Sequence, residues 1–177
     1  MKNILLLTIV SLFVIAACNN PTEQELTAKK ITELESKIYS DSTINFNPKD
    51  VTDLIVAYTN YVRQFPEDEI CPTYLFKAGE LAMNMNLSSQ AISNFSKIQR
   101  EYPKSERYPY SIFLQAFVYD TQLKNEEQAR EFYQKFINEF PNHELTDDAQ
   151  ASIENLGKSL DEIIKSFEEK NKAENKN

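Results

Sequence analysis

The chain has no tryptophan and only two glycines, two cysteines and one histidine among its 177 residues. It therefore has no Gly-rich phosphate-binding loop, and one histidine with so few cysteines cannot form a His/Cys zinc site. Basic residues are also few, with 19 Lys and Arg against 27 Asp and Glu, for a net charge of −8. So acidic a surface lacks the basic patch that nucleic-acid phosphates require. These absences argue against metalloenzymes and nucleic-acid-binding proteins, and we expect no cofactor.

Catalytic constellations are equally scarce. A Ser-His-Asp arrangement would have to use His143, which follows Pro141 in a loop and is expected to be solvated. The acidic pairs Asp147-Asp148 and Glu126-Glu127 are expected in first helical turns, where negative charge complements the helix dipole. The chain is therefore not expected to be an enzyme.

Three aromatic–proline pairs recur along the chain: Phe65-Pro66, Tyr102-Pro103 and Phe140-Pro141. The prolines stand 37 and then 38 residues apart. Proline cannot continue a helix, because it lacks an N–H and its ring clashes with the preceding turn. A fixed period of this length with a helix stop at its end indicates stacked helical hairpins.

Apolar residues keep a constant distance from each proline. They occupy the positions twelve, eight and five residues before it, which fall with the aromatic residue on one face of a helix. The prediction is that this face is buried core rather than a cofactor site. The residues are Leu54, Ala91 and Ala129; Tyr58, Phe95 and Tyr133; and Tyr61, Ile98 and Phe136.

This pattern resembles the tetratricopeptide repeat (TPR). In the second copy, Gly79, Ala91, Phe95 and Pro103 stand at that family's spacing of small, small, aromatic and proline residues. The third copy has Phe117 in place of the expected glycine, and the first has Leu54 in place of the expected alanine. The long period resembles the envelope subgroup typified by BamD, a subunit of the β-barrel assembly machinery, and by the Tol–Pal coordinator.

We therefore predict an all-α fold, a right-handed superhelical array of about three TPR-like hairpins with a C-terminal capping helix, over residues 25–170. Asn47 is expected to cap a helix that starts at Pro48, Thr146 to cap another, and Ser159 with Glu162 to form a capping box. The expected helices are 25–39, 48–65, 72–86, 88–101, 106–123, 125–140, 146–157 and 159–170, before a disordered tail at 171–177.

The N-terminus predicts an export signal. One lysine precedes the apolar run 4–15, which is too short to span a bilayer. The run Ile15-Ala16-Ala17-Cys18 matches the bacterial lipobox, so residues 1–17 are expected to be removed and Cys18 to be acylated, with 18–24 as a tether. The alternative is an ordinary secretory signal. Asn19 after the cysteine implies the outer membrane of a Gram-negative bacterium. We expect the protein to face the periplasm, and a surface-exposed orientation is the alternative.

Cys71 is then the only remaining thiol, so no intramolecular disulfide is expected. It precedes Pro72 where a helix begins, and we interpret it as a small buried residue. A reactive thiol is the alternative.

In TPR arrays the first helix of each hairpin lines a concave groove, so the resemblance implies a partner-binding groove here. Packing between helices is the alternative role for Phe76, Leu114 and Val118. Such a mixed apolar and amide surface suits a peptide. The implied positions are Thr73, Phe76, Glu80, Met83 and Asn84 in the second copy, and Ser111, Leu114, Val118, Thr121 and Gln122 in the third.

The functional hypothesis is a lipid-anchored periplasmic scaffold whose partners are envelope proteins or peptides, BamD-like in kind. Two alternatives stay open: a Tol–Pal-type coordinator of envelope constriction, and a groove that binds a small molecule or a peptidoglycan fragment.

Overall fold

The computed structural model describes residues 20–39 and 47–174, and these contain eight α-helices and no strands. The helices are α1 (Glu23–Tyr39), α2 (Pro48–Gln64), α3 (Cys71–Asn84), α4 (Ser88–Glu101), α5 (Arg107–Thr121), α6 (Glu126–Glu139), α7 (Thr146–Asn155) and α8 (Leu160–Glu174). The all-α prediction is confirmed. The signal segment with Cys18 and most of the loop before Asn47 lie outside the described residues.

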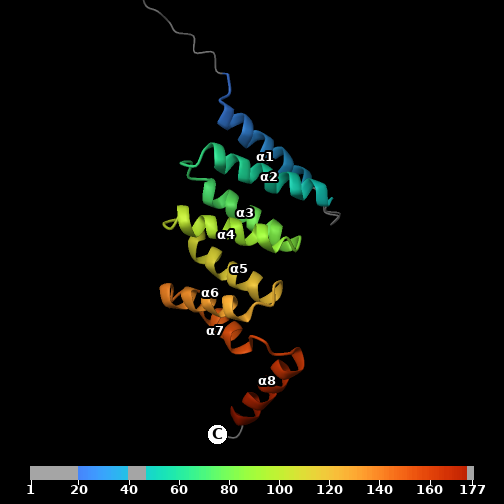
Figure 1. Cartoon of the computed structure of the whole chain (residues 1–177), viewed down its shortest axis with the longest axis vertical. Coiled ribbons are helices and arrows are strands. Elements are labelled where there is room, and N and C mark those ends of the chain that lie inside the picture. Colours follow the sequence, from blue (N-terminus) through green and yellow to red (C-terminus); the bar gives the residue numbers. More distant parts are fainter. Residues whose placement is uncertain (1–19, 40–46, 175–177) are drawn as a thin grey trace, which may run out of the picture.

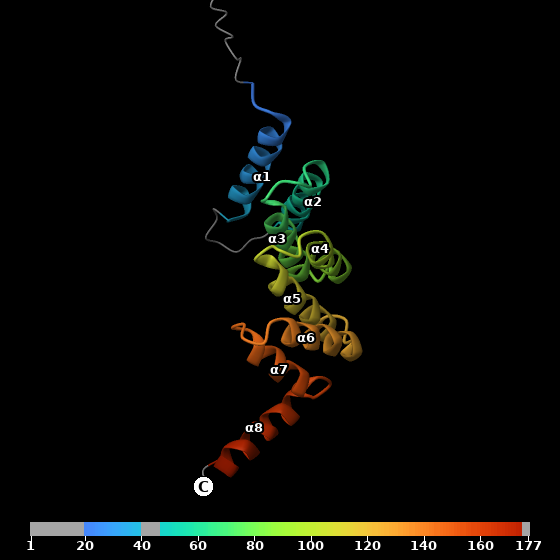
Figure 2. The ribbon, with the colours of Figure 1, turned by 90° about the vertical axis from the view of Figure 1, so that its left-hand side faces the viewer.

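Each helix from α1 to α6 packs against the next one along the chain, so the hairpins stack into an elongated array (Figure 1). Figure 2 shows α2, α4 and α6 on one side of the stack, with α1 and α7 on the other. The helices α3 and α5 also contact each other directly. We call α1, α3, α5 and α7 the A helices, and α2, α4 and α6 the B helices.

The predicted stripe of the B helices is buried throughout. The exposed fraction is 0–3% at all nine positions counted back from the prolines. The three aromatic residues directly before the prolines are half-buried, and the prolines themselves are exposed. The stripe is therefore core, as the spacing predicts.

The turn after each B helix has one repeated geometry. Phe65, Tyr102 and Phe140 have φ between −129° and −131° and ψ between 50° and 59°, and each donates its N–H to the carbonyl four residues earlier. The carbonyl of each then accepts from the N–H three residues later, at Asp68 and its two equivalents. The three junctions between hairpins are thus built alike.

The residue three positions after each of these aromatic residues has a side chain that accepts a hydrogen bond from the start of the next A helix. Asp68, Ser105 and His143 each accept a hydrogen bond from the N–H two residues later, over 3.0, 3.1 and 3.2 Å. His143 accepts through Nδ1, and its ring also contacts the rings of Tyr110 and Phe136. The expectation of a solvated loop histidine was wrong, because the turn uses the side chain as a structural acceptor.

The buried apolar side chains form two clusters. One joins α1 to α4 and includes Val118 of α5, and the other joins α5 to α7. Between them, buried Gln115 of α5 accepts from Ser96 and Gln99 of α4, over 3.1 and 2.8 Å. The contact of α4 with α5 therefore has a polar centre, which we call the polar seam.

The helix ends near the C-terminus differ partly from the prediction. Thr146 is the first residue of α7 and not its cap, because its hydroxyl donates to Phe140 O over 2.8 Å instead of accepting from α7. The Ser159–Glu162 capping box is confirmed in both directions, with Ser159 N donating to Glu162 and Glu162 N to Ser159. The last helix, α8, continues to Glu174, four residues beyond the expected Lys170, and extends away from the array (Figure 2).

Candidate functional site

The candidate site is the face of the A helices that is turned away from the B helices, which we call the inner face. Its N-terminal end is held by an ion pair of 2.6 Å between Lys77 of α3 and Glu35 of α1. Its centre is held by aromatic contacts between α3 and α5, where the Phe76 and Tyr110 rings lie 6.4 Å apart.

Four of the five positions predicted on α3 reach the surface. Asn84 is exposed, and Thr73, Glu80 and Met83 are half-exposed. Phe76 is only 7% exposed, because its ring packs on Phe95 and the Arg107 guanidinium covers it at 5.1 Å. Phe76 therefore has the packing role that the sequence left open.

The positions predicted on α5 fit less well. Ser111 and Val118 are completely buried, and the Ser111 hydroxyl donates to Tyr108 O. Leu114 is half-buried against the first cluster. Gln122 donates to Met83 O and accepts from the Ser88 hydroxyl, each over 2.7 Å. Of the five, only Thr121 is exposed. The prediction that Ser111 and Val118 line the groove was wrong.

The cause is one extra residue in the turn between α5 and α6. In the α3–α4 turn, Leu87 N donates to Ala82 O, five residues back, whereas Asn125 N donates to Tyr119 O, six residues back. Both turns contain one residue with positive φ, 55° at Asn86 and 52° at Lys124. Equivalent positions of α3 and α5 are therefore 37 residues apart, whereas those of α4 and α6 are 38 residues apart. Counting back from the prolines shifts every position on α5 by one.

The corrected inner face of α5 carries aromatic and acidic residues. Ala116, not Phe117, takes the place of Gly79, because Ala116 is fully buried in the second cluster whereas Phe117 is 38% exposed. Sequence reasoning missed the inner-face residues of α5, although counting forward from Ser105, the equivalent of Asp68, would have identified them. The inner-face positions of α5 are Tyr110, Phe113, Phe117, Asp120 and Thr121, and of these Phe113 packs on Tyr133 and Phe136 of α6.

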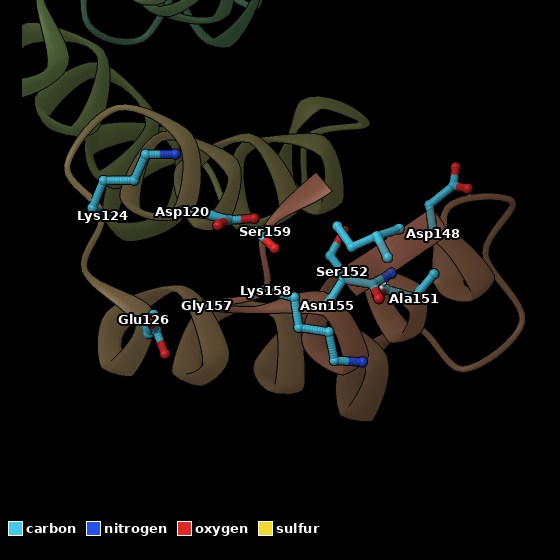
Figure 3. Close-up of a pocket in the computed structure, with 11 residues that line it drawn as sticks. Asp120, Lys124, Glu126, Asp148, Ala151, Ser152, Asn155, Gly157, Lys158 and Ser159 are labelled. Atoms are coloured by element: carbon cyan, nitrogen blue, oxygen red, sulfur yellow. Dashed lines mark hydrogen bonds between the residues drawn. The ribbon is translucent and has the colours of Figure 1, made fainter. Parts of the chain in front are cut away.

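A pocket of about 700 Å³ lies at the C-terminal end of the inner face, and we call it the C-terminal pocket (Figure 3). Asp120 of α5 lines it, together with Asp148, Ala151 and Asn155 of α7. These three residues stand 38 positions after Tyr110, Phe113 and Phe117. The pocket is thus the inner face continued onto α7, and it is completed by Lys124, Glu126, Ser152, Gly157, Lys158, Ser159 and Ile163.

Asp120 is the half-buried carboxylate of this pocket. Burial raises its pKa, Lys124 opposes that shift and Glu126 adds to it. Within residues 20–39 and 47–174, the Asp120 carboxylate forms no ion pair or hydrogen bond. In Figure 3 the side chains of Glu126 and Lys158 point away from Asp120.

Tyr133 of α6 lies close to the pocket and is completely buried. Its hydroxyl has no hydrogen-bond partner among the residues that the structure describes. Burial raises the pKa of Tyr133 to about 12, and the nearby Ser152, which lines the pocket, opposes this shift.

Glu80 on α3 is a second half-buried inner-face carboxylate. Burial raises its pKa, and Arg107 and Lys77 oppose the shift. Neither cation comes within ion-pair distance of Glu80 in the described part of the chain. The inner face thus offers carboxylates that are partly removed from water, next to aromatic rings.

Three tyrosines near the junctions between hairpins, Tyr102, Tyr108 and Tyr110, brace the array. Their hydroxyls donate to other elements: Tyr102 to Pro66 O over 2.9 Å, Tyr108 to Glu139 of α6 over 2.8 Å and Tyr110 to Glu144 over 2.9 Å. Cys71 is fully buried, with its Sγ donating to Phe65 O, and burial raises the pKa of this thiol. These contacts give the side chains structural roles.

The described residues contain no group of three or more His, Cys, Asp or Glu side chains placed to hold a metal ion. Nor does any helix in ranges 20–39 and 47–174 combine the length and apolar character needed to cross a membrane.

A tetratricopeptide repeat family model matches residues 73–105 and 110–143. The two matches start 37 residues apart and end 38 residues apart, which agrees with the extra residue between α5 and α6. Together they cover less than half of the chain. No curated protein matches it. The chain therefore contains TPR repeats, which support a protein-binding scaffold of a kind that is typically not catalytic.

Proposed function

We propose that this protein is a lipid-anchored scaffold on the periplasmic side of the outer membrane, which holds envelope proteins or peptides on its inner face. The observation that carries the proposal is the pairing of TPR repeats with an inner face that exposes aromatic and carboxylate side chains, among them Phe117 and Asp120. TPR arrays use this face for peptides, and aromatic residues are enriched in protein interfaces.

The anchor is the sequence-based part of the proposal. The lipobox ending at Cys18 would place two or more acyl chains only five residues before α1 begins at Glu23. Two chains give stable attachment to a bilayer, whereas one is marginal. Cys18→Ser should therefore release the protein from membranes. Persistence in the membrane fraction after a high-salt wash would contradict the lipid anchor.

The partner test is crosslinking and affinity capture from membranes with the anchor intact. Glu80→Lys with Asn84→Arg should abolish capture, since both side chains reach the surface of α3. Glu131→Lys with Asn138→Arg is a matched control, because it places the same changes on exposed sites of B helix α6. Unchanged capture by the first variant, with helical content intact by circular dichroism, would move the interface off the inner face.

The identity of the captured proteins separates the finer hypotheses. Subunits of the β-barrel assembly machinery would support a BamD-like role in outer-membrane protein assembly. Components of the Tol–Pal system would support the envelope-constriction role instead. Capture of no protein, together with binding of peptidoglycan fragments, would support the small-molecule alternative.

A further inference from the structure

We infer that the C-terminal pocket receives a basic side chain of the partner, with Asp120 as its counter-ion. This inference rests on the proposed function, because it names the chemistry of the segment that the inner face would hold. The pocket lies at the C-terminal end of that face, between α5 and the next A helix, α7 (Figure 3).

No described cation lies within ion-pair distance of the Asp120 carboxylate. A carboxylate that is partly removed from water is costly unless it is paired. The Asp120 carboxylate forms no ion pair or hydrogen bond with a described residue, and Lys124, one helical turn away, only opposes the rise of its pKa. An incoming ammonium or guanidinium group would offset this cost.

The lining also contains Lys124 and Lys158, of which Lys158 points away from Asp120 (Figure 3), and its other polar groups fit a cation with N–H donors. Asp148 supplies a second carboxylate, and Ser152, Asn155 and Ser159 supply neutral side-chain oxygens. Lysine and arginine carry three and five such donors on long stems, so either can reach acceptors on both α5 and α7. Three carboxylates line the pocket, Asp120, Glu126 and Asp148, but no group of three such side chains in the described residues is placed to hold a metal ion, so the pocket suits an organic cation better.

A neighbouring aromatic side chain indicates that the cation belongs to a peptide. Phe117 stands three residues before Asp120 on α5, hence on the same side of the helix, and it is 38% exposed. A partner segment with an apolar residue next to a basic one would cover Phe117 while it pairs with Asp120. The net charge of −8 would also attract such a segment from a distance.

The test compares two fluorescent peptides, Ser-Gly-Lys-Phe-Gly-Ser and the same sequence with norleucine in place of lysine. Norleucine keeps the apolar stem and removes the ammonium group. By fluorescence anisotropy with the full-length chain in detergent, the lysine peptide should bind about ten-fold more tightly. Asp120→Asn should remove this preference. The control Asp147→Asn removes an equal charge from an exposed site of α7 outside the pocket and should keep it.

Equal affinities for the two peptides, binding of neither peptide, or an equal loss in both variants would each overturn the inference. Such a result is separable from failure of the scaffold proposal, because the capture experiment depends on Glu80 and Asn84 of α3. Capture that is sensitive to those residues, with no lysine preference, would keep the scaffold and reject the basic partner.

Discussion

The contact between Gly79 and Phe95 gives the sharpest stability prediction. Exposed Gly→Ala changes inside helices usually stabilise by up to about 1 kcal/mol. Here a Cβ at position 79 would lie 2.5, 2.8 and 2.9 Å from three ring atoms of Phe95, well inside contact distance. The ring cannot simply move away, because it is completely buried and packs on Phe76 at 5.9 Å.

Overpacking of a core costs about 1–3 kcal/mol, which exceeds the gain in helix propensity. Gly79→Ala should therefore lower the free energy of unfolding by up to about 2 kcal/mol. In a Phe95→Leu background the ring atoms are gone, and the same change should be neutral or stabilising. Urea denaturation followed by circular dichroism on the four proteins gives the coupling energy. If Gly79→Ala stabilised the chain equally in both backgrounds, the close approach of α3 to α4 would be refuted.

Three further predictions concern the junctions between hairpins. His143→Ala should cost about 0.5–2 kcal/mol more in urea denaturation than His143→Asp, because both lose the ring but only Asp can accept from Leu145 N–H; equal losses would reject the acceptor role. In a Cys18→Ser chain, Cys71 should react with a thiol reagent far more slowly when folded than in urea, because burial raises its pKa and hides it; equal rates would contradict its burial. Hydrogen bonds from the Tyr61 hydroxyl and Ile70 N–H hold the pKa of Asp68 below its ordinary value of 3.8, so its contribution to stability is present above that pH and lost as pH falls through the folded value. Unfolding curves at several pH values should show this acid loss in the parent chain but not in Asp68→Asn, and identical profiles would contradict it.

The B helices could be predicted almost completely from the sequence. The positions in each B helix are counted back from the proline that ends it, and no turn lies between that proline and core residues such as Tyr58, Phe95 and Tyr133. The proline therefore fixes the numbering of the apolar positions in the same helix, and all nine predicted core positions are buried.

The A helices could be predicted only in part, because a turn separates them from the prolines. On α3 that turn has the family's length, and Thr73, Glu80, Met83 and Asn84 do reach the surface. The turn before α6 holds one extra residue, and no apolar pattern marks it. One residue turns a helix by about 100°, so Ser111 and Val118 face the core while Phe117 faces outward. The role of His143 was missed because Asp68, Ser105 and His143 share no chemistry except a side-chain acceptor.

The polar seam makes the array a pair of blocks rather than a uniform rod. An opening at Gln115 would part α4 from α5 while leaving most of each apolar cluster intact, so it should be the cheapest sub-global unfolding step along the stack. Amide protons near the seam would then exchange ahead of those in the B-helix cores. Because α3 and α5 lie on opposite sides of the seam, bending there would change the spacing between Glu80 and the C-terminal pocket, against the direct contacts of α3 with α5. The seam would act as an elastic joint that adapts the length of the inner face to the segment it holds.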